Sequence, residues 1–450
     1  MSENLSRNIL LRFIKITSVI LAAIPFALAW HVYARGGLLF PDYMTGYILG
    51  IVVFMILFCL FGKIYEAFYI SMNPIPEMIY SQSLAVFATD AVMYIFAWIL
   101  RGEVPNLLPG IACLVAQIIL AALWAYMAQH AYFFMFPAEK TAVIYDTNRN
   151  IADLIRQKKL EKKYDIKLDM PVAECIKDIS VLDKMQTVFI AGVHSKERNI
   201  IMKYCVMRNI NVVVVPRLGD IIMSSSVSSH LFHFPMLVIN RYGASISYLF
   251  IKRTFDILIS LMALVILSPI MLIVAIAIKL DDGGPIIYSQ KRLTKDAKEF
   301  YIYKFRSMKV NAEQDGVARL STGSNDTRVT NVGRILRKFR LDELPQLINI
   351  LKGDLSIVGP RPERPEIAAE YEKDMPEFAL RLTAKAGLTG YAQVYGQYNT
   401  APYDKLQMDL MYIAHPSLIE DFKIIMATIK ILFMSESTEG VSEGQVTASR

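Results

Sequence analysis

The chain has 450 residues, of which 54% are hydrophobic and 20% charged, and its mean hydropathy is +0.36. Soluble globular proteins are about 45–50% apolar, so this composition argues against a fully soluble protein and excludes disordered, collagen-like and disulfide-scaffold chains. The net charge of +7 fits the positive flanks of membrane helices or a phosphate-binding site. A nucleic-acid partner is not indicated, because the basic residues lack the aromatic stacking platforms of a known module.

Four long apolar segments come first in the chain, at residues 16–33, 43–61, 82–100 and 107–136. Each is long enough to cross a hydrocarbon core of about 30 Å. Arg7, Arg12 and Lys15 precede the first segment, so we expect the N-terminus on the cytoplasmic side. The sequence predicts a four-helix transmembrane domain over residues 1–138. Asp90 in the third segment either bonds a neighbouring helix or contacts a proton or substrate.

Short β-rich runs alternate with helix-like segments over residues 139–245. The expected strands are 141–145, 187–193, 211–216 and 236–240, and the expected helices are 148–159 and 195–207. This alternation predicts a Rossmann-like α/β middle domain. Its first strand–helix turn, at residues 145–149, lacks the glycines that let a pyrophosphate approach the backbone. We therefore favour a regulatory or assembly role over nucleotide binding.

A fifth apolar run covers residues 254–280 and has basic residues at both ends, which include Arg253 and Lys279. Ser268 and Pro269 interrupt it near the middle, and proline removes a helical hydrogen bond. Two interpretations stay open on this pattern. One is a kinked transmembrane helix, and the other is a re-entrant membrane helix at 252–280 that leaves by the face it entered.

The segment after this run is basic and mixed α/β, and we assign residues 246–435 to one domain. Its last helix, 418–434, interleaves lysines with isoleucines and so suits an interfacial, amphipathic position. Residues 436–450 are expected to form a flexible tail. The four cysteines of the chain form no CxxC pair and no zinc-type spacing, which indicates reduced thiols.

Basic residues concentrate between positions 291 and 309. The alternation of residues 300–306 predicts a strand with Lys304 and Arg306 on one face. Two cations on one face suit a diphosphate, although a solvated edge strand would show the same pattern. A helix is expected over 331–340, with Thr330 as its N-cap and Arg337 near its end.

An acidic pair, Asp342 and Glu343, follows that helix. In one interpretation Asp342 only caps a helix that runs from Glu343 to Lys352 and ends at Gly353. In the other, nearby arginines keep the carboxylates ionised, Asp342 attacks phosphorus, and its neighbour holds a divalent cation. Arg361 stands between two prolines, a rigid setting that suits a phosphate contact or a structural turn.

Seven stretches between residues 252 and 433 resemble, in order, the bacterial sugar transferase family, the monotopic polyprenyl-phosphate hexose-1-phosphate transferases. The four N-terminal segments and the Rossmann-like domain resemble the large members of that family. The matching stretches are Lys252-Arg-Thr-Phe-Asp256, Ser268-Pro269, Gly284-Pro-Ile-Ile-Tyr-Ser-Gln290, Tyr303-Lys-Phe-Arg-Ser-Met308, Leu341-Asp-Glu-Leu-Pro-Gln-Leu347, Lys352-Gly-Asp-Leu-Ser-Ile-Val-Gly-Pro-Arg-Pro362 and Gly387-Leu-Thr-Gly-Tyr-Ala-Gln393.

The resemblance implies a role for each of these residues. Asp342 matches the nucleophile, and Glu343 matches its partner, with both assigned to Mg²⁺. Ser268 and Pro269 match the break of a re-entrant membrane helix, which favours the hairpin over the kinked span. The remaining matches are basic positions assigned to substrate phosphates: Lys304, Arg306, Arg337 and Arg361.

The resemblance also implies a reaction. A UDP-sugar donates its sugar-1-phosphate to undecaprenyl phosphate, in two steps through an aspartyl intermediate, and UMP is released. The expected place is the bacterial inner membrane, multi-pass, with the catalytic domain on the cytoplasmic face against membrane lipid. The sequence identifies neither the sugar nor the polysaccharide, and it leaves a homodimer open.

Two alternatives remain beside this hypothesis. A polytopic transferase that acts by direct displacement would need many more membrane spans. A catalytically silent scaffold or regulator of polysaccharide assembly would fit the turn without glycine and the departures from the family pattern. These departures are Thr294 and Ala297 in place of the usual glycines, and Lys385-Ala386 where Arg-Pro is common.

Overall fold

The computed structural model describes residues 2–35, 43–146, 151–231, 233–239, 244–310, 328–396 and 400–432. The chain divides into two compact units, Met1–Val215 and Pro216–Arg450. The predicted tail at 436–450 and the turn residues 147–150 lie outside the described residues.

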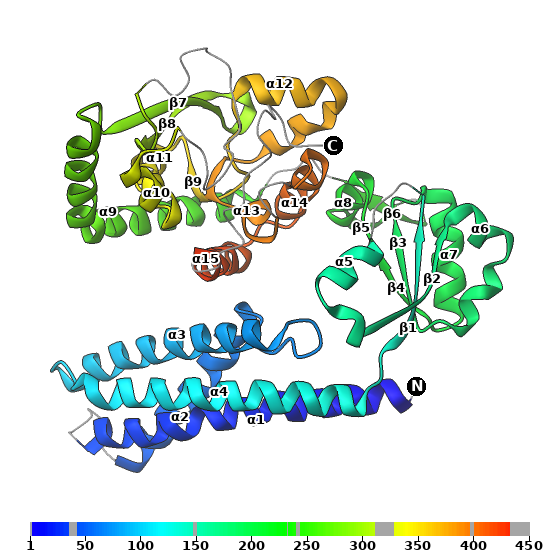
Figure 1. Cartoon of the computed structure of the whole chain (residues 1–450), viewed down its shortest axis with the longest axis horizontal. Helices are drawn as coiled ribbons and strands as arrows, with labels where there is room; N and C mark the ends of the chain where they lie inside the picture. Colours follow the sequence, from blue (N-terminus) through cyan, green and yellow to red (C-terminus); the bar gives the residue numbers. More distant parts are fainter. Residues whose placement is uncertain are drawn as a thin grey trace. The chain divides into compact units, whose positions relative to one another are not determined.

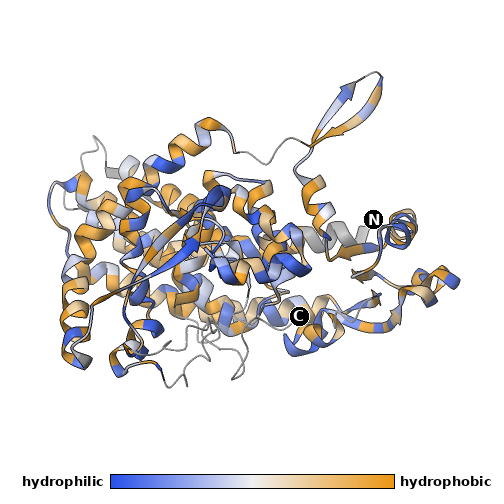
Figure 2. Cartoon of the chain, turned by 90° about the horizontal axis from the view of Figure 1, so that it is seen from above, coloured by the Kyte–Doolittle hydropathy of each residue, from blue (hydrophilic) through white to orange (hydrophobic). Residues whose placement is uncertain are grey.

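Four long helices open the first unit and pack along one another (Figure 1): α1 (Ser2–Arg35), α2 (Tyr43–Ile64), α3 (Ile75–Arg101) and α4 (Leu107–Met135). All four are long and apolar enough to cross a membrane, which confirms the predicted N-terminal helical bundle. Orange, hydrophobic stretches follow long runs of helix in Figure 2. Asp90 lies on α3 and accepts a hydrogen bond from the Cys113 thiol of α4 at 3.9 Å, as its bundle-interior interpretation predicts.

The Rossmann-like part of the first unit is a four-stranded parallel sheet of order β2-β1-β3-β4. Figure 1 shows α5 on one face of the sheet and α6 and α7 on the other. The core consists of apolar side chains that alternate along β1 and β3, such as Ile144 and Ile190. The elements are β1 (Glu139–Tyr145), α5 (Ile151–Gln157), η1 (Leu160–Lys162), β2 (Tyr164–Pro171), α6 (Val172–Lys177), η2 (Ile179–Lys184), β3 (Thr187–Ala191), α7 (Ser195–Met207) and β4 (Asn211–Val214).

The structure differs from the sequence-based assignment of this domain in two strands. Strand β2 was not predicted, although its apolar residues alternate with Asp165, Lys167 and Asp169, a pattern that suits an edge strand. The predicted strand at 236–240 does not join the parallel sheet. It corresponds to β6 (Phe234–Val238), which pairs with β5 (Val227–Leu231) in an antiparallel hairpin.

The second unit begins with α8 (Leu218–Ser224), whose Ile221 belongs to the main core of this unit. A β7–β8 antiparallel pair and a β9–β10 parallel pair form its frame. The remaining elements are α9 (Ile246–Asp282), β7 (Ile287–Leu293), η3 (Lys295–Ala297), β8 (Glu299–Phe305), α10 (Asn331–Lys338), η5 (Leu341–Glu343), α11 (Gln346–Lys352), β9 (Ser356–Val358), α12 (Pro365–Asp374), η6 (Pro376–Thr383), β10 (Gly387–Thr389), α13 (Tyr391–Tyr395), α14 (Pro402–Ala414) and α15 (Leu418–Leu432).

Helix α9 has two arms that meet at a bend (Figure 1). A straight helix of 37 residues would extend about 55 Å. Both arms instead contact the same domain. In the first arm Asp256 accepts hydrogen bonds from the Ser356 hydroxyl at 2.8 Å and the Ile357 amide at 3.1 Å. In the second arm Val274 and Ile278 share a cluster with residues of β8 and α10. Pro269 lies inside the helix, so it accounts for the bend.

The turn between β7 and β8 carries backbone strain that a single substitution can test. Asp296 and Ala297 both adopt a φ of 57°, a region where the Cβ of an L-residue is crowded. Replacing Ala297 with glycine should raise the free energy of unfolding by about 1 kcal/mol. Thermal unfolding in detergent measures the gain. Asp296→Gly is the matched control, with a smaller gain because aspartate tolerates this region better. An unchanged or lower melting temperature for Ala297→Gly would contradict the argument.

Candidate active site

Strand β8 carries Lys304 and is tied to helix α11 by the side chain of Asn349. The Asn349 carboxamide accepts a hydrogen bond from the Tyr303 amide at 2.9 Å and donates one to the Tyr301 carbonyl at 2.8 Å. Its side chain is fully buried. Asn349 therefore takes the place of a neighbouring strand at the second edge of β8, because a carboxamide offers the same donor and acceptor as a peptide group.

Asp342 and Glu343 lie in η5, a short 3-10 turn between α10 and α11. Arg340 precedes the turn with a φ of 51°, which reverses the chain direction after α10. Thr330 caps α10 as predicted, since its hydroxyl accepts from the Gly333 amide at 3.0 Å. Of the two interpretations of Asp342, the capping one is wrong, because α11 starts only at Gln346 and its N-cap is Pro345.

Glu343 is the centre of an ion-pair network. The Lys304 ammonium donates to its Oε1 at 2.9 Å, and the Arg361 guanidinium lies 3.5 Å from the same oxygen. Burial by itself would raise the pKa of Glu343, but the positive charges of Lys304 and Arg361 outweigh it. They hold the pKa of this carboxyl well below its usual range, so Glu343 is ionised at neutral pH.

Asp342 is 9% exposed, and at this carboxyl the effect of burial outweighs that of the nearby positive charges. Burial raises the pKa of the Asp342 carboxyl, and the charge of Glu343 adds to this effect. Lys304 and Arg337 act against it but do not cancel it. Nearby cations keep Glu343 ionised, and burial makes Asp342 the more basic member of the pair.

The other predicted basic residues occupy two different places. Arg337 lies near Asp342 and donates from Nε to the Ser307 hydroxyl at 3.0 Å. Arg306 is buried, and a Cβ on Gly284 would lie only 2.0 Å from its Nη1. Gly284 therefore leaves space for the Arg306 guanidinium.

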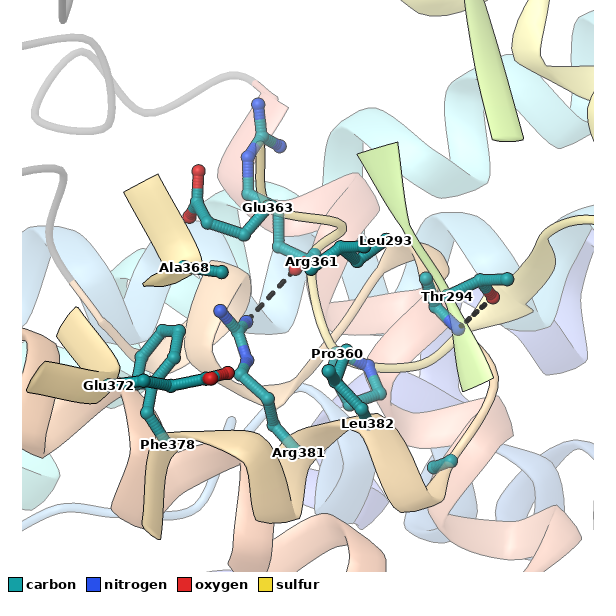
Figure 3. Close-up of a pocket in the computed structure, with 12 residues that line it drawn as sticks. Leu293, Thr294, Pro360, Arg361, Glu363, Ala368, Glu372, Phe378, Arg381 and Leu382 are labelled. Atoms are coloured by element: carbon teal, nitrogen blue, oxygen red, sulfur yellow. Dashed lines mark hydrogen bonds between the residues drawn. The ribbon is translucent and has the colours of Figure 1, made fainter. Parts of the chain in front are cut away.

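Arg361 follows β9 in a turn that is fixed by close backbone packing. A Cβ on Gly359 would lie 2.3 Å from the Lys385 carbonyl oxygen, so only glycine fits there. Arg381 donates to the Arg361 carbonyl at 2.9 Å. Figure 3 shows this bond at a pocket that Arg361, Arg381, Phe378 and Thr294 help to line. The guanidinium of Arg361 reaches the carboxylate pair.

The donor set around the pair suits a cation that also binds substrate. Within the described residues there is no group of three or more His, Cys, Asp or Glu side chains that could hold a metal. Mg²⁺ is commonly bound by one or two carboxylates together with substrate phosphates. Two adjacent carboxylates, one of them firmly ionised, fit that kind of site.

Asn349 offers a test of how the site is held together. Asn349→Leu removes the bonds to the amide of Tyr303 and the carbonyl of Tyr301. Because unpaired buried polar groups are costly, the free energy of unfolding should fall by about 2–4 kcal/mol. Ile350→Val, on the same helix, is the control and should cost about 1 kcal/mol. Equal melting temperatures for the two variants would show that the Asn349 side chain does not hold β8 to α11.

Four polar residues that position this site received no role from the sequence: Asn349, Ser307, Arg253 and Asp256. Arg253 donates to the carbonyls of Ile350 and Leu351 at the end of α11. The one local signal for Asn349 was a polar residue among the isoleucines of α11. The partners of these side chains are 30 to 101 residues away in sequence.

These features define a membrane protein with a carboxylate pair among cations in a mixed α/β domain. Residues 247–435 match the model of the family described as bacterial sugar transferase. A second match is the exopolysaccharide production protein PSS of Rhizobium leguminosarum bv. phaseoli, 41% identical over 203 residues, 43% of this chain and 98% of that protein. The chain belongs to the bacterial sugar transferase family.

Two longer relatives match about half of this chain. The UDP-N-acetylgalactosamine-undecaprenyl-phosphate N-acetylgalactosaminephosphotransferase of Aeromonas hydrophila is 37% identical over 234 residues, 51% of this chain and 53% of that protein. The UDP-glucose:undecaprenyl-phosphate glucose-1-phosphate transferase of Escherichia coli K12 is 39% identical over 204 residues, 44% of this chain and 42% of that protein. The alignments thus span about half the length of these curated relatives.

Proposed function

We propose that this protein transfers a sugar-1-phosphate from a UDP-sugar to undecaprenyl phosphate and so initiates exopolysaccharide or capsule synthesis. The observation that carries the proposal is the Asp342–Glu343 pair, with Lys304 2.9 Å and Arg361 3.5 Å from Glu343. A buried carboxylate pair among cations suits a phosphate-bearing substrate. Relatives named for undecaprenyl-phosphate sugar transfer are 37% and 39% identical to this chain over 234 and 204 residues.

The reaction has two displacements at phosphorus. In the first, an Asp342 oxygen bonds to the β-phosphorus of the donor, the bond to the bridging oxygen breaks, and UMP leaves with that oxygen. In the second, a phosphate oxygen of undecaprenyl phosphate attacks the same phosphorus, and Asp342 leaves as a carboxylate. The products are undecaprenyl-diphosphate-sugar and UMP. Burial supports the nucleophile, because a carboxylate with a raised pKa is more basic.

The cations act on the charge that these displacements redistribute. Lys304 and Arg361 already neutralise Glu343, so they keep a donor diphosphate from being repelled by the acidic pair. Arg337, held by Ser307, lies on the side of Asp342. Asp342 and Glu343 would hold Mg²⁺ together with the diphosphate, and the cation would supply further charge neutralisation there.

The shape of α9 supports a re-entrant position in the membrane. Large apolar side chains are exposed along both arms, among them Leu261, Val265 and Leu272. Both arms nevertheless contact one catalytic domain. A helix that crossed the bilayer would carry its two ends to opposite faces. We therefore place the bend around Pro269 within one leaflet, with the carboxylate pair near the surface where lipid and soluble substrates meet.

Release of UMP tests the proposed reaction. Purified protein in nanodiscs would receive undecaprenyl phosphate, Mg²⁺ and a panel of UDP-hexoses. We expect UMP with at least one donor, none after EDTA treatment, and recovery when Mg²⁺ is restored. The donor that reacts identifies the sugar. Absence of UMP with every donor would count against the transferase and favour the silent scaffold, to which the Rossmann-like domain would then be central.

A further inference from the structure

Three separate segments meet at the side chain of Thr294, directly after β7. Thr294 is 5% exposed. Its hydroxyl donates to the Asp354 carbonyl at 3.0 Å and accepts from the Ala386 amide at 3.2 Å. The second of these bonds is one of the dashed lines in Figure 3. With a φ of −126° the backbone is extended, so this position does not require glycine.

Ala386 belongs to the segment against which the Arg361 turn is built. The Ala386 carbonyl accepts from the Ser356 amide at 2.9 Å, at the start of β9. The next amide, that of Gly387, donates to the Pro360 carbonyl at 2.9 Å. A shift at Ala386 would therefore move the backbone on which Arg361 stands.

The C-terminal end of β7 also bonds the backbone that follows Arg361. The Leu293 amide donates to the Glu363 carbonyl at 3.0 Å. Leu293, the last residue of β7, thus bonds the backbone after Arg361, and Thr294 bonds the Ala386 segment that packs against the turn.

We propose that the Thr294 hydroxyl is a positioning group that holds Arg361 at the carboxylate pair by fixing the Ala386 segment under the Arg361 turn. The proposal rests on the proposed function in so far as Arg361 contacts the donor diphosphate. The Thr294 hydroxyl acts through the backbone groups of residues that are 60 and 92 positions away in sequence.

The hydrogen bond from the Ala386 amide to the Thr294 hydroxyl couples residues 294 and 386. Proline has no N–H to donate, so a proline at 386 would leave the Thr294 hydroxyl without its donor. A residue without an acceptor at 294 would leave the Ala386 amide buried and unpaired. The acceptor and the donor that it needs occur together in this chain.

The test compares two substitutions that separate the hydroxyl from the methyl group. Thr294→Val keeps the shape and loses the hydroxyl, whereas Thr294→Ser keeps the hydroxyl and loses the methyl group. We expect Thr294→Val to lower kcat for UMP release about tenfold, with KM for the donor within about twofold, and Thr294→Ser to retain most of the activity. Thr383→Val is the matched control, because its hydroxyl bonds only the local Leu380 carbonyl, at 2.8 Å.

Amide hydrogen exchange gives a readout that does not require turnover. In Thr294→Val the amides of residues 385–387 should exchange about tenfold faster, and in Thr294→Ser and Thr383→Val they should not. If the wild type released no UMP, the proposed function would fail while exchange still decided the role of Thr294. A serine variant as impaired as the valine variant, or unchanged exchange in both, would overturn the proposal.

A double-mutant cycle tests the coupling directly. Ala386→Pro should impair the wild type more than it impairs Thr294→Val, because the valine variant has already lost the hydrogen bond. Additive effects of the two substitutions on kcat and melting temperature would contradict the coupling. Should Ala386→Pro not fold, the valine and serine variants decide the question alone.

Discussion

Asp342→Asn should abolish UMP release, with a loss of about 10³-fold or more, because asparagine cannot form the covalent phosphosugar intermediate. The same substitution should leave the melting temperature unchanged or raise it. Burial disfavours the charged form of Asp342, as its raised pKa shows, so a neutral amide of the same shape removes an unfavourable charge. UMP release and thermal unfolding in detergent measure the two effects.

Intact-mass spectrometry tests directly for the proposed covalent intermediate on Asp342. Wild-type protein given a UDP-sugar without acceptor should gain the mass of one sugar phosphate, and Asp342→Asn should not. Glu343→Gln is the control, because it alters the neighbouring carboxylate and leaves the proposed nucleophile in place. Turnover by Asp342→Asn at the wild-type rate, or an adduct on another residue, would refute the assignment of the nucleophile.

Asp409→Leu should lower the free energy of unfolding by about 3–5 kcal/mol, the largest stability effect we expect in the catalytic domain. Asp409 on α14 and Arg381 in η6 form an ion pair of 2.6 Å, with side chains 1% and 5% exposed. Removing Asp409 leaves the Arg381 guanidinium buried without its counter-charge. The decrease in melting temperature in detergent measures the effect.

A double replacement distinguishes the effect of the Arg381–Asp409 ion pair on stability from its effect on activity. Arg381→Met with Asp409→Leu should recover most of the stability, because an apolar pair can replace a buried ion pair. The activity should stay below that of the wild type, because the Arg361 carbonyl loses its bond from Arg381. A double variant as unstable as Asp409→Leu would show that the buried charge is not the source of the loss.

Local patterns predicted much of the fold. Runs of apolar residues located the long helices, and the Thr330 hydroxyl capped α10 as expected. These features depend on neighbours within a few residues, so the sequence shows them directly. Strand β2 was not predicted, although its apolar residues alternate with charged ones as in an edge strand. Residues 234–238 form a strand that pairs with β5, and the composition of a strand does not show which strand is its partner.

The sequence by itself determined which residues could carry the chemistry: an Asp-Glu pair, a basic strand, and an arginine between two prolines. Only the tertiary structure decided how they act together. Lys304 meets Glu343 across 39 residues of chain because Asn349 joins β8 to α11. The different environments of Asp342 and Glu343 follow from burial and from the charges that reach each carboxylate. Such long-range contacts depend on how separate elements pack, and no local pattern in the chain encodes them.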